Sequence, residues 1–204
     1  MAKEKQMDTK TNFYFKKLPE NYVADFVIDV REKKLAWIVR ILYISLLAIT
    51  FVVCEAFNRF NFSFRFALLR TILTPIIFIA AYIVMVVLHE LIHGLFNIIF
   101  TREKLEFGFA KGSAYCGMPN IYLKKGPKMV VVMAPFFTFL IALVIALIFI
   151  KDPYYYMVVS IFLGLHVGGC SGDLIEFFIL FFKYHGKKVL VGDTGPTQTI
   201  YIAQ

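Results

Sequence analysis

Four long apolar runs constrain most strongly how this 204-residue chain can fold. Each run is long enough for a helix that crosses the hydrocarbon core of a bilayer, which takes about 20 residues. The predicted spans cover residues 35–57, 69–100, 129–150 and 154–182. Since 59% of the residues are hydrophobic, well above the roughly 45–50% of soluble domains, we expect an all-α integral membrane protein with four transmembrane helices.

Lysines and arginines gather on one side of these spans. Seventeen of them lie in residues 1–34, in the loop of residues 101–128 and in the tail after Phe182. The loops on the other side carry four, namely Arg59, Arg65, Arg70 and Lys151. The positive-inside rule then predicts a multi-pass protein of the cell membrane with both termini in the cytoplasm. Because the cations flank apolar runs, the net charge of +8 indicates a lipid bilayer as partner and no nucleic acid.

The second predicted span contains the motif His89-Glu90-Leu91-Ile92-His93. Helical spacing places both imidazoles on one face, where they can bind a single Zn²⁺ ion, and Glu90 can act as a general base toward a metal-bound water. Ionisable side chains at membrane depth are costly and usually have a function. The motif therefore predicts a zinc site inside the membrane. The alternative is a metal-free polar network between helices.

A catalytic zinc site of this kind needs a third protein ligand, and the fourth predicted span offers Asp173. His93 lies nine residues before Arg102, and Asp173 lies ten residues before Lys183. Both side chains are thus roughly 14–15 Å from the cytoplasmic ends of two parallel spans. We therefore predict His89, His93 and Asp173 as the metal ligands.

Two other polar residues of the fourth span leave alternatives open. His166 can be a fourth metal ligand, a hydrogen-bond donor to the oxyanion, or a histidine with no part in the chemistry. Glu176 can replace Asp173 as a ligand, support a ligating histidine, or lie at the boundary between lipid and water. A fourth protein ligand would close the site and favour a structural zinc.

The segments outside the spans suggest a division into three regions. Residues 1–34 form a cytoplasmic amino-terminal segment, residues 35–182 the transmembrane domain with the candidate site, and residues 183–204 a cytoplasmic tail. We expect short strands in residues 21–30 and 189–202, the second interrupted by a turn at 192–196. Glycines spaced through residues 101–128 favour extended or re-entrant backbone.

The motif in one membrane span, followed by Gly172-Asp173 in a later one, resembles the site-2 protease class of intramembrane metalloproteases. Spans two to four and the tail segment 191–195 are more closely similar to a family of small bacterial membrane proteins described as zincin peptidases. The resemblance implies His89, His93 and Asp173 as zinc ligands and Glu90 as general base.

These observations together predict an intramembrane zinc metalloprotease that hydrolyses peptide bonds near the cytoplasmic leaflet. Its partners are membrane-protein or peptide substrates. The oligomeric state does not follow from the sequence. The alternative is a non-catalytic membrane protein that binds zinc for structure, sensing or transport, and the role of His166 separates the two.

Overall fold

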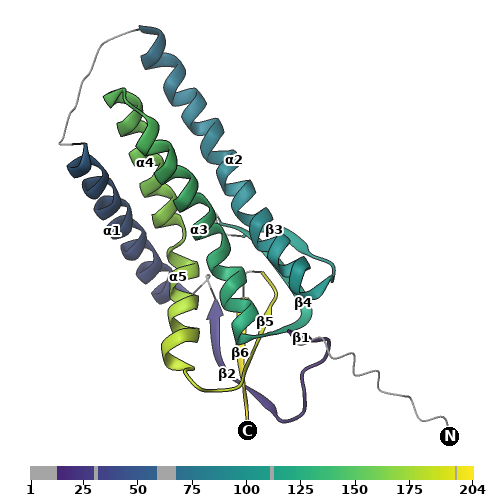
Figure 1. Ribbon diagram of the computed structural model, residues 1–204. Coiled ribbons are helices and arrows are strands. Elements are labelled where there is room, and N and C mark those ends of the chain that lie inside the picture. Colours follow the sequence, from purple (N-terminus) through teal and green to yellow (C-terminus); the bar gives the residue numbers. More distant parts are fainter. Residues whose placement is uncertain (1–12, 30–31, 59–67, 111–112, 196) are drawn as a thin grey trace, which may run out of the picture.

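The computed structural model describes residues 13–29, 32–58, 68–110, 113–195 and 197–204. The helices form an elongated bundle, with a β-sheet at the end where the carboxyl terminus lies (Figure 1). The loop with Arg59 and Arg65, and Pro196 of the predicted turn, lie outside the described residues.

The long helices coincide with the predicted apolar spans. They are α1 (Lys33–Phe57), α2 (Leu68–Thr101), α3 (Lys125–Phe149), α4 (Pro153–Gly169) and α5 (Ser171–Phe178), and α5 continues into the π-helical turn η1 (Ile179–Lys183). Among the described residues, three helices are long and apolar enough to cross a membrane. A fourth span results if the α4 and α5–η1 pair, bent by 42°, counts as one. The fourth predicted span is thus bent at Cys170 rather than continuous.

The helices carry many apolar side chains on the outside of the bundle. Ile77, Ile141 and Ile148 are 64%, 58% and 72% exposed, although large apolar side chains are normally buried in water-soluble proteins. Extended exposed apolar surface marks contact with a membrane or a partner. The bundle is therefore compatible with a surrounding lipid bilayer.

Helices α1 and α4 approach closely along two glycines. A Cβ atom built on Gly168 would lie 2.9 Å from the carbonyl oxygen of Tyr43, and one on Gly164 would lie 3.1 Å from that of Leu47. Small residues four apart allow helix backbones to pack at short distance in membranes. This packing fixes α4 just before the bend that leads to Asp173.

A six-stranded antiparallel sheet corrects the all-α prediction. The strands are β1 (Tyr14–Phe15), β2 (Tyr22–Asp29), β3 (Glu106–Ala110), β4 (Ser113–Lys124), β5 (Val189–Asp193) and β6 (Thr197–Ala203). They pair in the order β1-β4-β5-β6-β2, with β3 on β4. Strands were expected near β2, β5 and β6, but their assembly into one sheet was not, because the pairings of β1 with β4, β2 with β6 and β4 with β5 join segments that are distant in sequence.

Tyr184, at the end of η1, connects the sheet to the helices. Its ring is fully buried in a core with Ile28, Leu180 and Ile200. Its hydroxyl donates a hydrogen bond of 2.5 Å to Asp25 of β2, and this bond lowers the pKa of the Asp25 carboxyl. The sheet is thus fixed against the helix ends, and its strands β2, β4, β5 and β6 line one cavity together with polar residues of α2 and α5.

Candidate active site

Helix α2 places His89 and His93 one turn apart on the same face, as the spacing in the motif predicts. Their rings meet edge to face with centroids 4.8 Å apart, and their Nε2 atoms are 3.1 Å apart. Two ring nitrogens so close together suit a shared cation.

Asp173, in the first turn of α5, completes this group. Its Oδ2 atom lies 3.2 Å from Nε2 of His89, and its Oδ1 atom lies 3.5 Å from Nε2 of His93. The bend between α4 and α5 precedes Asp173 by three residues. The structure therefore brings together the three residues predicted as metal ligands, each with one donor atom within 4.8 Å of the others.

A backbone carbonyl of α3 orients His93. Nδ1 of His93 lies 2.9 Å from the carbonyl oxygen of Val131, to which it can donate a hydrogen bond. In a regular helix this carbonyl would accept from the N–H four residues later, but residue 135 is a proline and has no N–H. With Nδ1 protonated, Nε2 of His93 presents its lone pair to His89 and Asp173.

The distances in this group fit zinc. Donor atoms around a tetrahedral zinc, bound at about 2.0–2.1 Å, lie about 3.3 Å apart. The three distances between His89, His93 and Asp173 are 3.1, 3.2 and 3.5 Å. Three protein ligands leave one position of the tetrahedron for water or substrate, which is the arrangement of catalytic rather than structural sites.

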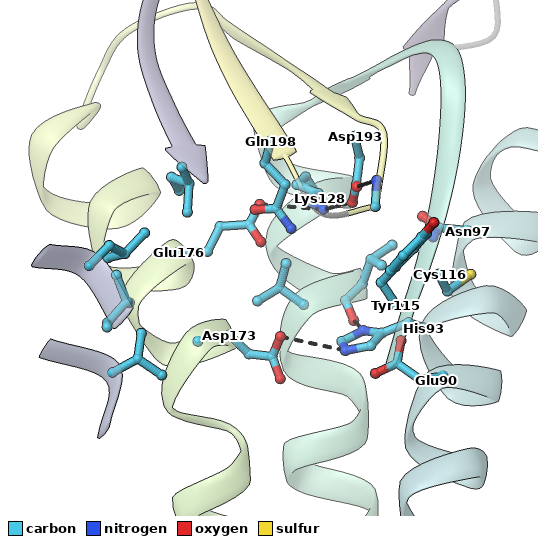
Figure 2. Close-up of a pocket in the computed structure, with 18 residues that line it drawn as sticks. Glu90, His93, Asn97, Tyr115, Cys116, Lys128, Asp173, Glu176, Asp193 and Gln198 are labelled. Atoms are coloured by element: carbon cyan, nitrogen blue, oxygen red, sulfur yellow. Dashed lines mark hydrogen bonds and ion pairs between the residues drawn. The ribbon is translucent and has the colours of Figure 1, made fainter. Parts of the chain in front are cut away.

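A cavity of about 150 Å³ lies beside these residues, between the helices and the sheet (Figure 2). Glu90, His93 and Asp173 line it from the helices, and Tyr115 of β4 and Asp193 of β5 line it from the sheet. Figure 2 shows the carboxylate of Glu90 next to the ring of His93. The predicted general base thus faces the same space as two of the predicted ligands.

A buried ion cluster closes the far side of this cavity. Nζ of Lys128, in the first turns of α3, lies 2.5 Å from Oδ2 of Asp193 and 3.4 Å from Oε1 of Glu176. All three side chains are at most 8% exposed. Glu176 is therefore a buried ion-pair partner of Lys128, one turn from Asp173.

Neither Lys128 nor Asp193 was singled out by the sequence analysis. The one available signal was Lys128 itself, a cation at the start of an apolar run, which is usually a flanking charge at the membrane surface. Asp193 comes from β5, and the position of β5 depends on the sheet, which the sequence analysis did not predict.

Cys116 of β4 also lines the cavity. Burial raises the pKa of its thiol to about 11, with a further contribution from the carboxylate of Glu90. The side chain is 7% exposed. At neutral pH Cys116 is therefore a thiol, and it forms part of the cavity wall without being a reactive nucleophile.

His166 lies outside the group of His89, His93 and Asp173. Its ring is 2% exposed and stands 6.1 Å from the ring of His89, between centroids. Nε2 lies 3.3 Å from the carbonyl oxygen of Phe136. Together with His89 and Cys170 it forms a second group of possible metal donors within the described residues.

Two helix histidines, a carboxylate from another helix and a glutamate at the adjoining cavity define a candidate zinc-peptidase site. The comparison with protein families agrees with this class. The model of a family described as "Putative zincin peptidase" matches residues 82–187, more than half of the chain, and the chain belongs to this family. The family implies zinc as the cofactor and suggests a metallopeptidase. No curated protein and no solved structure matches the chain.

Proposed function

We propose that the protein is an intramembrane zinc metallopeptidase, similar to site-2 proteases, that hydrolyses peptide bonds of membrane proteins near the cytoplasmic leaflet. The observation that carries the proposal is the convergence of His89, His93 and Asp173 beside a cavity that Glu90 also lines. His89 and His93 come from α2, which is long and apolar enough to form a membrane span, and Asp173 comes from α5, which belongs to such a span only together with α4 across the bend.

The residues have separate tasks in this reaction. Zinc, when bound by His89, His93 and Asp173, supplies Lewis-acid chemistry that activates water and polarises the peptide carbonyl. Glu90 takes a proton from the attacking water and returns it to the leaving amine. The Val131 carbonyl holds His93 with Nε2 directed at the site.

The hairpin of β3 and β4 supports a way to present a substrate. Within the described residues β3 pairs with β4 alone, so its other edge is open for an added strand. A Cβ atom on Gly94, the residue after His93, would lie 2.9 Å from Leu105 and 3.1 Å from Phe107. The hairpin therefore packs against α2 at the residue that follows His93, and a strand added to β3 would bring an extended substrate close to this turn of the helix.

The substitution Glu90→Gln tests this proposal. We expect purified Glu90→Gln protein to retain about one zinc per chain, because Glu90 is not among the grouped donors, whereas His89→Ala loses the metal. In a proteomic comparison of membranes, peptide fragments present with wild type should be missing with Glu90→Gln, and uncleaved substrates should accumulate.

The same experiment distinguishes the alternative, a non-catalytic zinc protein. If both proteins hold zinc and their membranes contain the same fragments, the peptidase proposal is wrong and zinc has a structural, sensing or transport role. If wild-type protein purified without chelators contains no zinc, both proposals fail.

A further inference from the structure

A second group of donor atoms lies beside the candidate zinc site, where α4 bends into α5. His166 and Cys170 are four residues apart at the end of α4, and they are 2% and 0% exposed. Each offers one donor atom that lies within 4.8 Å of a donor atom of His89. His89 therefore belongs to both groups, and His166 and Cys170 take no part in the proposed hydrolysis.

The hydrogen bonding of His166 leaves a nitrogen available for a metal. Its Nε2 atom lies 3.3 Å from the carbonyl oxygen of Phe136 on α3, to which it can donate. The Nδ1 atom then carries the lone pair, and it lies 4.0 Å from Sγ of Cys170. His93 shows the same arrangement with the carbonyl of Val131, and a backbone partner of this kind is typical of metal-ligating histidines.

The donor set indicates the kind of ion. Around a tetrahedral ion with bonds of about 2.3 Å to sulfur and 2.0–2.1 Å to nitrogen, sulfur and nitrogen lie about 3.6 Å apart. The Sγ atom of Cys170 lies 4.0 Å from Nδ1 of His166, so the two donor atoms approach each other by about 0.4 Å when the ion binds. A thiolate with two imidazoles is a softer set than two imidazoles with a carboxylate.

We propose that His89, His166 and Cys170 form a second metal site, which binds a thiophilic d¹⁰ ion such as Cd²⁺ or Cu⁺. Binding releases the thiol proton of Cys170 to solvent, and Sγ bonds to the ion as a thiolate. Because His89 is common to both groups, an ion at this site perturbs zinc binding by His93 and Asp173. The proposal does not depend on the peptidase activity.

Cadmium titration of the purified protein tests the site. The Asp173→Ala variant removes the carboxylate of the first group, so that Cd²⁺ reports on the second. We expect one Cd²⁺ per chain and an ultraviolet sulfur-to-cadmium charge-transfer absorption. We expect Cys170→Ser in this background to lose the absorption and to bind Cd²⁺ at least roughly tenfold more weakly.

Two other cysteines provide matched controls. Cys54 and Cys116 are also buried and free, but neither lies in a described group of possible metal donors. Cys54→Ser and Cys116→Ser should both retain the absorption, while His166→Gln should lose most of it. This second variant tests the site even if Cys170→Ser fails to fold.

An absorption that survives Cys170→Ser in folded protein, or that never forms in the Asp173→Ala parent, would overturn the proposal. In either case the experiment leaves the proposed hydrolysis untouched, because no step of it measures peptide cleavage. Conversely, if Glu90→Gln leaves the peptide fragments in the membranes unchanged, the peptidase proposal fails, but cadmium binding at Cys170 is not affected.

Discussion

At the scale of single residues, the cavity is dominated by charges that are paired across elements. Lys128 is the ammonium that balances Asp193 of β5 and Glu176 of α5. Oε1 of Glu176 has no hydrogen-bond partner in the described structure, and its contact with Lys128 is the longer of the two. Buried carboxylates are costly without such a counter-charge, so the cluster depends on Lys128.

We therefore expect Lys128→Met to destabilise the protein by about 3–5 kcal/mol, because two carboxylates remain buried without a cation. Unfolding of the purified protein in detergent, followed by circular dichroism, measures this loss. Lys151→Met is the control, since Lys151 is exposed and should change stability by less than about 0.5 kcal/mol. Equal stabilities of the two variants would show that the cluster contributes little.

At this scale the sequence predicts the candidate metal ligands but not the buried ion pairs next to them. His89 and His93 follow from helical periodicity alone, and Asp173 from its equal depth in a parallel span. The ion pair of Lys128 with Asp193 joins residues 65 positions apart, through a strand whose partners no local pattern reveals. Contacts of that kind depend on the tertiary fold.

At the scale of secondary-structure elements, α3 contributes backbone groups to the site. Pro135 lies inside α3 and is fully buried. Its missing N–H leaves the Val131 carbonyl free to accept from His93. The sequence shows a proline inside an apolar run. Its effect on His93 could not be predicted, because the sequence does not show which side chain faces the Val131 carbonyl.

The substitution Pro135→Ala tests this role. Alanine restores an N–H that competes with His93 for the Val131 carbonyl, so the imidazole loses its orientation. We expect zinc to bind about 10–100-fold more weakly, although alanine suits a helix interior far better than proline. Competition with a chromophoric chelator measures the zinc affinity.

Pro75→Ala is the matched control, because Pro75 is the interior proline of α2 and lies more than three turns before His89. This variant should bind zinc as tightly as wild type. If Pro135→Ala also binds zinc with wild-type affinity, the Val131 carbonyl does not position His93.

The helices show which structural features the length of an apolar run predicts and which it does not. Apolar run length gave the positions of α1, α2 and α3 to within a few residues. It did not give the bend at Cys170, because run length does not register the four glycines at residues 164, 168, 169 and 172, which weaken the helix there. The close approach of Gly168 to Tyr43 depends on α1, which is distant in sequence.

At the scale of the whole molecule, segments from three parts of the chain combine at one end of the bundle. The strand β2 near the amino terminus pairs with β6 of the tail, and β4 of the central loop pairs with β1 and β5. These are the segments that carry seventeen of the lysines and arginines. Twelve of these cations lie among the described residues, in or next to the strands and the adjoining helix ends, which is the side that the sequence analysis predicts to be cytoplasmic.

This arrangement predicts which ends of the helices face the cytoplasm. Lys151, between α3 and α4, should lie outside the cell, and Lys188, just before β5, should lie inside. Both side chains are exposed, so a cysteine at either position should react with a membrane-impermeant maleimide. The three native cysteines are buried, so the wild-type protein provides a blank.

We expect Lys151→Cys to be labelled in intact cells and Lys188→Cys to be labelled only after the membrane is permeabilised. Labelling of Lys188→Cys in intact cells, with Lys151→Cys protected, would invert the topology and place the candidate active site near the outer leaflet. Labelling of both in intact cells would mean that the helices do not separate the two positions across a membrane. The expected pattern would place the cavity, which lies between the helices and the sheet, at the cytoplasmic side of the membrane.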